Sequence, residues 1–381
     1  MKILVAPNAF KESLTAPQAA QALALGIKAV LPAARITQVP IADGGDGTLE
    51  AIVAGTRGRI LKARVKGPLG NPITAEYGIT GDGKTAIIEM SRASGLALVP
   101  RQRRNPMQTT SFGTGQLIVA ALERGVRHIL LGIGGSATVD GGVGALQALG
   151  IRFLDRRRRS VGPGGKGLLE TESIDLSQLH PALQKVRLQV ACDVDNPLVG
   201  PKGAAAVFGP QKGATARMVG QLDKGLAKLS SLIKELTGNN VAHIPGTGAA
   251  GGIAGSFLGL LQAELKPGSE LVFKLLNVEK LIPRMDWIIT GEGQIDFQTP
   301  FGKGPGMLAK LAGKYRIPVI GIAGAIADDI DPLFEQGFTA VFSIVDRPME
   351  LSEAMRNAHH LMQKTAEQVA RLIRAAKRRS P

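Results

Sequence analysis

The chain has 381 residues, and at about 150 residues per domain this length predicts two or three domains with ample core. Hydrophobic residues make up 44% and charged residues 20% of the chain, as in ordinary globular proteins. The single cysteine, Cys192, excludes an intramolecular disulfide and fits a reducing compartment. The apolar run at the N-terminus is too short for a signal peptide, and no apolar stretch approaches a membrane span. We therefore expect a cytoplasmic protein with no membrane partner.

The net charge of +15 raises the question of a nucleic-acid partner. Arginines fill positions 156–159, and Arg101, Arg103 and Arg104 form a second basic cluster. Aromatic residues are only 4% of the chain and do not alternate with these clusters, so a stacking platform for single strands is not expected. We interpret the basic residues as solvated surface charge that also attracts anions. A non-enzymatic nucleic-acid-binding protein stays as an alternative.

The first segment has the pattern of a parallel α/β unit. A continuous apolar run predicts a buried strand over residues 3–6, followed by a loop. Thr15 is the expected N-cap of a helix, and Gln18 completes a capping box. A second strand is predicted over residues 36–39. Apolar residues at helical spacing mark the buried face of the helix: Leu23, Ile27, Val30 and Leu31.

The pattern changes after residue 48 and changes back near the C-terminus. Strands over residues 60–65, 73–79 and 85–90 are predicted to form an antiparallel meander, with a turn at Gly81-Asp82-Gly83. Further strands are predicted over residues 128–133, 186–191, 287–290, 319–322 and 340–344, and helices over 307–315 and 332–336. A final helix is predicted over residues 351–374, with Leu351, Met355, Met362, Val369, Leu372 and Ile373 on its buried side.

The strand count indicates how the domains are organised. Two parallel-type strands at one end and three at the other make no usual sheet alone. We therefore predict an α/β fold with one doubly wound domain from residues 1–48 plus 285–381, and an inserted mixed α/β domain over residues 49–284. The cleft between the domains is the expected active site, because ligands bind at the carboxyl ends of the strands in such sheets.

Glycine is in excess, with 49 residues against a usual share of about 7%. Glycine-rich or polar loops follow predicted strands at residues 7–13, 43–48, 132–142 and 291–304. Such loops let main-chain N–H groups approach a ligand, and a helix N-terminus beyond them attracts phosphate. No Walker loop occurs. Residues 246–251 match G-x-G-x-x-G without a convincing strand before them, so a dehydrogenase is a minor alternative.

Carboxylates gather at the same strand ends. Phosphoryl transfer needs Mg²⁺ held by one or two carboxylates plus phosphates, and a carboxylate that orients or deprotonates the attacking hydroxyl. Any single Asp could equally be an Asx-turn or an N-cap, but the set favours chemistry. Lys11 and Lys303 add cations for a phosphate or a substrate carboxylate. The carboxylates are Asp43, Asp46, Asp140, Asp193, Asp195, Glu292 and Asp296. Together these residues indicate an α/β enzyme that binds a phosphorylated ligand with Mg²⁺, without naming the acceptor.

At these loops the sequence closely resembles the bacterial glycerate kinase family. The matching stretches span nearly the whole chain: residues 7–16, 42–48, 89–96, 109–115, 132–142, 191–213, 246–252 and 290–304. The resemblance implies a flavodoxin-like or Rossmann-like parallel-sheet domain interrupted by an inserted one. It also implies Mg²⁺-dependent transfer of a phosphoryl group from ATP to D-glycerate, giving ADP and 2-phosphoglycerate or 3-phosphoglycerate. Asn8 and Val139 depart from the family pattern and bear on substrate contacts.

The resemblance further implies roles for individual residues. Asp193 is the candidate base and Lys11 a second catalytic candidate, while Asp195, Glu292 and Asp296 are candidates for holding Mg²⁺. The candidates for ATP are Gly44, Gly45, Asp46, Gly134, Gly135, Ser136, Thr138 and Lys303, and those for glycerate are Ser13, Asp43 and Asp140. Residues 44–48 also resemble the nucleotide loop of diacylglycerol and NAD kinases, so another small-molecule kinase is an alternative. The sequence leaves a homodimer open.

Overall fold

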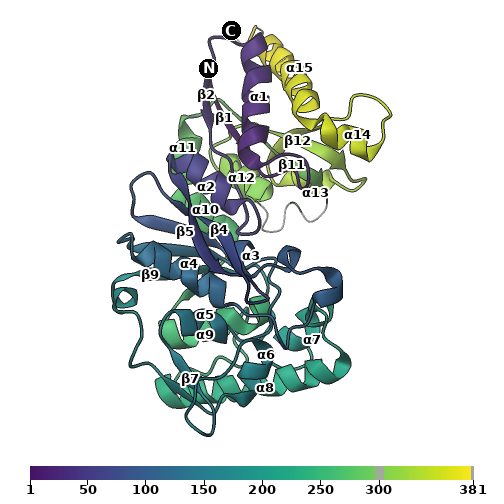
Figure 1. Cartoon of the computed structure of the whole chain (residues 1–381). Helices are drawn as coiled ribbons and strands as arrows, with labels where there is room; N and C mark the ends of the chain where they lie inside the picture. The colour runs from purple at the N-terminus through teal and green to yellow at the C-terminus, as the bar shows by residue number, and fades with distance from the viewer. Residues whose placement is uncertain (297–298, 300–303, 379–381) are drawn as a thin grey trace. The chain divides into compact units, whose positions relative to one another are not determined.

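The computed structural model describes residues 1–296, 299 and 304–378 (Figure 1). The chain divides into two compact units. The first unit comprises Met1–Asp43, Glu50–Arg57 and Ser269–Pro381, and the second comprises Gly44–Leu49 and Gly58–Gly268. The first unit is thus built from both ends of the chain, as the strand count indicated. The domain limits after residues 48 and 284 remain a prediction.

The first unit contains a five-stranded parallel sheet. Its strands are β1 (Lys2–Pro7), β2 (Arg35–Gln38), β11 (Trp287–Ile295), β12 (Val319–Ile326) and β13 (Phe338–Ser343). They lie in the order β13-β12-β11-β1-β2, and every neighbouring pair is parallel. Renumbered within the sheet, this is the 2-1-3-4-5 order of flavodoxin-like folds, which confirms the predicted fold class. The order reverses between β1 and β11, so the ends of these two strands mark the switch point where such sheets bind ligands.

Helix α1 (Ala16–Val30) begins at the predicted cap. Thr15 accepts a hydrogen bond from the main-chain N–H of Gln18, whose side chain bonds back to the Thr15 main chain. The helix packs beside α15 (Ala358–Arg378), as Figure 1 shows. Gly26 allows this close approach, because a Cβ there would lie 2.2 Å from the carbonyl oxygen of Gln363.

The long C-terminal helix of the sequence prediction is wrong in one respect. The segment forms two helices, α14 (Leu351–Arg356) and α15, separated at Asn357. Met362, Val369 and Ile373 are buried on the predicted face, whereas Leu351 and Leu372 are 75% and 58% exposed. Leu372 lies at the edge of the buried stripe, where the described residues leave most of its side chain uncovered. The other helices of this unit are α10 (Gly268–Leu275), α11 (Val278–Leu281), α12 (Gly304–Gly313) and α13 (Asp331–Glu335), and α2 (Thr48–Thr56) begins in the second unit.

The second unit contains a six-stranded mixed sheet and a two-stranded ribbon. The larger sheet has the order β10-β9-β6-β5-β4-β3; β3, β4 and β5 pair antiparallel, and β5, β6, β9 and β10 pair parallel. Its strands are β3 (Arg59–Lys66), β4 (Pro72–Ile79), β5 (Thr85–Glu89), β6 (His128–Gly132), β9 (Arg187–Ala191) and β10 (Glu264–Lys266), and the ribbon is β7 (Arg152–Leu154) with β8 (Ser173–Asp175). The predicted meander is confirmed. The parallel pairing brings the carboxyl ends of β5, β6 and β9 to one edge of the sheet.

Apolar helices cover this sheet and form the larger core. They are α3 (Ser91–Ser94), α4 (Phe112–Leu122), α5 (Val143–Ala148), α6 (Gly164–Glu170), α7 (Ala204–Phe208), α8 (Ala216–Thr237) and α9 (Ile253–Leu261). The core includes Ile88, Leu131 and Val190 from the three neighbouring parallel strands. Over the described residues, no helix combines the length and the apolar character that a membrane crossing requires.

Candidate active site

Two glycine loops of the second unit lie against each other at the carboxyl edge of its sheet. The first glycine loop is the segment 44–49, and the second is the segment 132–142, which follows β6. Gly44 has φ +88°, and a Cβ added to it would lie 2.7 Å from the Cβ of Ala191 and 2.8 Å from the Cα of Gly268. A Cβ on Gly132 would lie 2.7 Å from the carbonyl oxygen of Gly44. Glycine is required here because the main chains of the two loops approach too closely for any side chain.

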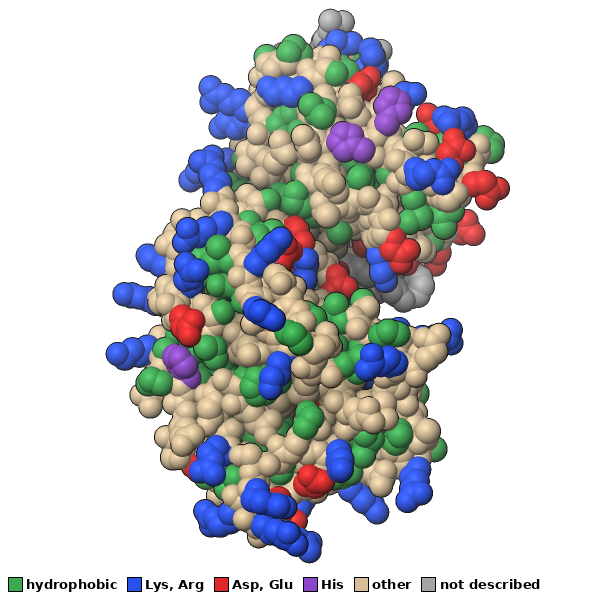
Figure 2. Space-filling view, viewed as in Figure 1, with side chains coloured by type: hydrophobic (Ala, Val, Ile, Leu, Met, Phe, Trp, Pro, Cys, Tyr) green, Lys and Arg blue, Asp and Glu red, His purple; other side chains and the backbone are tan. Residues whose placement is uncertain are grey.

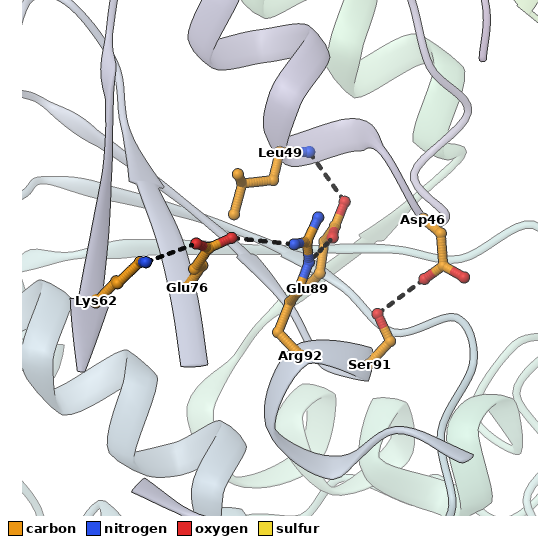
Figure 3. Close-up of polar contacts among 7 residues, drawn as sticks. All are labelled: Asp46, Leu49, Lys62, Glu76, Glu89, Ser91 and Arg92. Carbon is orange, nitrogen blue, oxygen red and sulfur yellow. Dashed lines mark hydrogen bonds and ion pairs between the residues drawn. The ribbon is translucent and has the colours of Figure 1, made fainter. Parts of the chain in front are cut away.

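An exposed acid lies where these loops meet. The Oδ1 atom of Asp46 accepts a hydrogen bond of 2.8 Å from the hydroxyl of Ser91 (Figure 3). Gly135 has φ +67°, and its added Cβ would lie 3.7 Å from the same Asp46 oxygen. Gly134, Gly135 and Asp46 are all exposed. The arrangement offers bare main chain and a carboxylate side by side, which are the groups that bind a phosphate and its cation.

A buried acid that the sequence analysis missed holds the first glycine loop in place. Glu89, at the end of β5, is 2% exposed and accepts 2.9 Å hydrogen bonds from the main-chain N–H of Leu49 and from Arg92 Nε. Arg92 also forms an ion pair with Glu76, with 3.2 Å between Nη1 and Oε2. The other oxygen of Glu76 lies 3.6 Å from Nζ of Lys62 (Figure 3). A charged residue at the end of an otherwise apolar strand was the available signal for Glu89.

The rear of the second glycine loop is buried. Asp140 has no exposed surface and accepts hydrogen bonds from the main chain and hydroxyl of Ser111 at 2.8 and 2.7 Å. It also accepts from the N–H groups of Gly142 and Gly144 at 3.1 and 3.4 Å. A carboxylate with this many donors is well satisfied without a ligand. Asp140 therefore fixes the turn from the loop into α5.

A buried lysine, also missed by the sequence analysis, lies beneath the same loop. Lys212 is 2% exposed, and its Nζ donates to the hydroxyl oxygen of Ser136 at 2.8 Å and to the carbonyl of Thr138 at 2.7 Å. Burial lowers the pKa of Lys212 to about 7, while the charge of Asp140 acts in the opposite direction. Its neighbours in sequence, Gln211 and Gly213, gave no signal of this position.

The predicted base and one predicted metal ligand follow β9. Asp193 and Asp195 are both exposed, and Asp193 Oδ1 accepts a 2.9 Å hydrogen bond from the N–H of Gly268. Gly268 also contacts Gly44, so Asp193 lies at the same edge of the sheet as the first glycine loop. The structure thus brings together the first glycine loop, the second glycine loop and Asp193, which the sequence placed at separate strand ends.

In the first unit, the loop after β1 lies beside the C-terminal half of β11 at the switch point of the sheet. The N–H of Asn8 donates to the carbonyl of Gly291 at 2.8 Å. A Cβ on Gly293 would lie 3.4 Å from the main-chain nitrogen of Lys11. The Lys11 side chain is exposed, and Glu12 adopts a left-handed φ of +61°, which is uncommon for a non-glycine residue. An exposed cation therefore lies at the position where this fold binds ligands.

Glu292 near the end of β11 and Asp296 just after it belong to a small polar group. Glu292 is 7% exposed, and its Oε1 accepts a 2.9 Å hydrogen bond from the hydroxyl of Thr299. The N–H of Asp296 donates to the same hydroxyl oxygen at 3.2 Å. Asp43, also in this unit, is half-buried, and the hydroxyl of Ser13 donates to the carbonyl of Met355 at 3.1 Å.

The candidate metal ligands are carboxylates at several strand ends. Among residues 1–296, 299 and 304–378, no three or more His, Cys, Asp or Glu side chains form a metal cluster. Mg²⁺ takes oxygen ligands and commonly keeps one or two protein carboxylates plus phosphate oxygens and waters. The carboxylates of Asp46 and Asp195 in the second unit, and separately those of Glu292 and Asp296 in the first, have the chemistry that such a cation requires. Lys303, predicted to contact ATP, lies outside the described residues.

Part of the basic surface is paired with acidic side chains. The four arginines at 156–159 are exposed, but Arg156 pairs with Glu172 at 3.0 Å and Arg159 with Asp155 at 2.9 Å. Lys and Arg side chains are spread over the face that Figure 2 shows, with acids between them. This distribution agrees with solvated surface charge.

The fold and these loops define a class of protein: α/β proteins with a flavodoxin-like sheet, a second mixed unit, and glycine loops with carboxylates at the strand ends. Comparison with known proteins gives the family. The model of the glycerate kinase family matches residues 3–374. A glycerate kinase of Halalkalibacterium halodurans is 50% identical over 97% of each chain, and a glycerate 2-kinase of Escherichia coli K12 is 47% identical over 97% of each.

A solved structure agrees with this assignment. The crystal structure of a protein assigned as glycerate kinase 2, from Salmonella typhimurium LT2, superimposes with a TM-score of 0.92 at 45% identity, over 99% of both chains. The chain belongs to the glycerate kinase family, and as a member it is an enzyme, a transferase. The resemblance seen in the sequence is confirmed.

Proposed function

We propose that this enzyme transfers the terminal phosphoryl group of ATP to the C2 hydroxyl of D-glycerate, with Mg²⁺, giving 2-phosphoglycerate and ADP. The name of the Escherichia coli relative, glycerate 2-kinase, supports the position of transfer. The observation that carries the proposal is the pair of glycine loops, whose exposed main chain lies beside the carboxylate of Asp46. This is a surface for phosphate and metal rather than for an apolar ligand.

The first and second glycine loops are the proposed phosphate cradle. Gly134 and Gly135 are exposed and Gly45 is partly exposed, so their N–H groups can approach the phosphates, whereas the buried Gly44 lets the first glycine loop pack closely. The hydrogen bond from Ser91 holds the Asp46 carboxylate beside Gly135. Lys303 remains a proposed partner of a phosphate on the basis of its sequence position.

Asp193 is the proposed group that orients the attacking hydroxyl of glycerate and accepts its proton. It is exposed, and the N–H of Gly268 donates a hydrogen bond to its Oδ1 atom. General bases need to reach the proton at hydrogen-bond distance, and a carboxylate fixed at one oxygen meets that condition with little reorganisation. Lys11 and Asp43, both in the first unit, are proposed to contact the substrate or the transferring phosphate.

Asp195, Glu292 and Asp296 remain the proposed candidates for holding Mg²⁺, each on the basis of its own position at a strand end. Mg²⁺ held by such carboxylates would neutralise charge on the phosphates during transfer. The hydroxyl of Thr299 accepts from Asp296 and donates to Glu292, so it holds these two residues near each other before any cation binds.

Two residues predicted to bind glycerate are proposed to have structural duties instead. The oxygens of Asp140 are occupied by donors of its own unit, and the Ser13 hydroxyl donates to the main chain before α14 ends. We propose that Asp140 shapes the second glycine loop and that Ser13 holds the loop after β1. Because ATP is a cytoplasmic cosubstrate, we propose that the enzyme acts in the cytoplasm.

The test is an assay of ADP release with purified enzyme, ATP and D-glycerate, with Mg²⁺ varied and then removed by chelation. Turnover that requires both Mg²⁺ and D-glycerate is expected. Phosphorus NMR of the product should show the ester at C2. An ester at C3 would overturn the position of transfer, and turnover without Mg²⁺ would overturn the metal. An L-glycerate sample serves as the matched control for the acceptor.

A further inference from the structure

Lys212 is a buried cation with no part in the proposed chemistry. It ends the short 3₁₀ segment Pro210–Lys212, and Gly213 follows with φ +91°. A Cβ on Gly213 would lie 2.2 Å from the carbonyl oxygen of Arg104, so the main chain behind the lysine is tightly packed. Burying a charged lysine is costly unless the ammonium has good partners. A lysine held at this depth therefore needs a structural or functional reason.

The partners of Lys212 all belong to the second glycine loop. Its Nζ bonds to the hydroxyl of Ser136 and to the main-chain carbonyl of Thr138, at 2.8 and 2.7 Å. The hydroxyl of Thr138 is buried and has no hydrogen-bond partner among the described residues. Lys212 therefore contacts Thr138 through the main-chain carbonyl and not through the side chain. Bonds from an ammonium are stronger than neutral ones. Lys212 thus spans two positions, one on either side of Ala137.

We propose that Lys212 is a positioning residue that fixes the turn from Ser136 to Thr138, so that Gly134 and Gly135 present their main chain to the phosphates of ATP. The inference rests on the proposed function of these glycines. It adds a residue that touches neither substrate nor metal and acts through the loop alone.

The stability of the closed loop depends on whether Lys212 is protonated. Among the described residues, Asp140 is the charged group that acts on the ammonium from the packed loop, while Pro210 and Gln211 beside it carry no charge. Because burial lowers the pKa of Lys212 to about 7, the charge is lost as the pH rises through neutrality. Opening of the loop would return Lys212 to water and to its ordinary pKa, so opening takes up a proton and should become less favourable as the pH rises above neutrality.

The test compares the full chain with Lys212→Met, which keeps the length of the side chain but removes the charge. Lys224→Met is the matched control, because Lys224 is exposed on α8. Hydrogen exchange of segment 132–142, without substrates, should be at least about tenfold faster in Lys212→Met and unchanged in the control. This measurement does not depend on turnover, whereas a wild-type enzyme inactive with ATP and glycerate would count against the proposed function instead.

The second readout is KM for ATP between pH 6 and 9. In the wild type it should fall as the pH passes neutrality, because the ordered loop is then favoured, and in Lys212→Met it should be raised about tenfold and stay level with pH, with kcat changed less. A variant with wild-type exchange and the wild-type pH profile would overturn the proposal. If Lys212→Met does not fold, Ser136→Ala removes one partner and keeps the charge. It should raise KM about threefold, and no change would also overturn the proposal.

Discussion

On one side of the second glycine loop, Gly134 and Gly135 are exposed beside the exposed carboxylate of Asp46. On the other side, a few residues along, Asp140 is buried among four donors and Lys212 lies beneath the loop. We call these the open side and the buried side. Each side contains an aspartate after a glycine-rich segment. The exposed aspartate is available to a ligand, whereas the buried one has a structural role.

The difference shows that the same local sequence can serve chemistry or architecture. An exposed carboxylate keeps oxygens for a ligand, whereas a buried one has exchanged water for protein donors and is costly to disturb. Substitutions on the open side should therefore change activity more than stability. Substitutions on the buried side should do the reverse, and each prediction below tests one half of this contrast.

The largest effect is expected for Asp193→Asn, an exposed acid at the same edge of the sheet as the open side. Turnover should fall by about 10²- to 10⁴-fold, because a positioned base contributes that much to proton transfer. The amide oxygen can still accept from Gly268, so the free energy of unfolding should change little. Steady-state ADP release and urea unfolding measure the two quantities. Near-normal turnover in this variant, with ATP still bound, would remove Asp193 from its proposed role.

Asp140→Ala should have the largest effect on stability. It leaves buried donors of Ser111 and Gly142 without a partner, so the free energy of unfolding should fall by about 3 kcal/mol or more. Urea unfolding monitored by circular dichroism measures it. Asp195→Ala, at an exposed position, is the control and should change stability by about 0.5 kcal/mol or less. Equal losses in the two variants would contradict the contrast between the sides.

The pH dependence of stability should show the cost of the buried ammonium. The pKa of Lys212 is about 7 in the folded protein and 10.5 by its ordinary value, so the unfolded chain binds more protons between these values. The free energy of unfolding should therefore gain about 2 kcal/mol between pH 7 and 8.5 from this group. Urea unfolding at pH 7 and 8.5 measures this gain as the change in the free energy of unfolding of the wild type minus the same change in Lys212→Met. A difference of zero or of opposite sign would show that the lysine is not buried as a charge.

The smallest effect is expected for Gly135→Ala on the open side. Its φ of +67° is unfavourable for alanine, and the added Cβ would lie 3.3 Å from the Cβ of Ser91. We expect a loss of about 1–2 kcal/mol in stability together with a higher KM for ATP. Thermal unfolding and initial rates measure these, with Gly220→Ala as the control because nothing lies within 4 Å of its added Cβ. An unchanged KM would argue against a phosphate contact at Gly135.

The sequence by itself determined much of the architecture. Apolar runs located the strands, and the Thr15 and Gln18 pair located the start of α1, because these signals depend on local chain geometry. Its strand count placed both chain ends in one sheet. It also found the glycine loops and most of the exposed acids, since loops that approach ligands closely need glycine wherever they occur.

Tertiary structure alone decided which acids are buried and which remain open. Asp46 and Asp140 both follow strand ends, and nothing local distinguishes the exposed one from the one surrounded by donors. Lys212 and Glu89 were missed for the same reason, because the partners that give them their roles, Ser136 and Leu49 respectively, lie more than 35 residues away in the chain. The exposure of Leu351 likewise depends on which parts of the surface the folded chain covers. Burial is a property of the packed whole, and it sets both the protonation and the duty of a polar side chain.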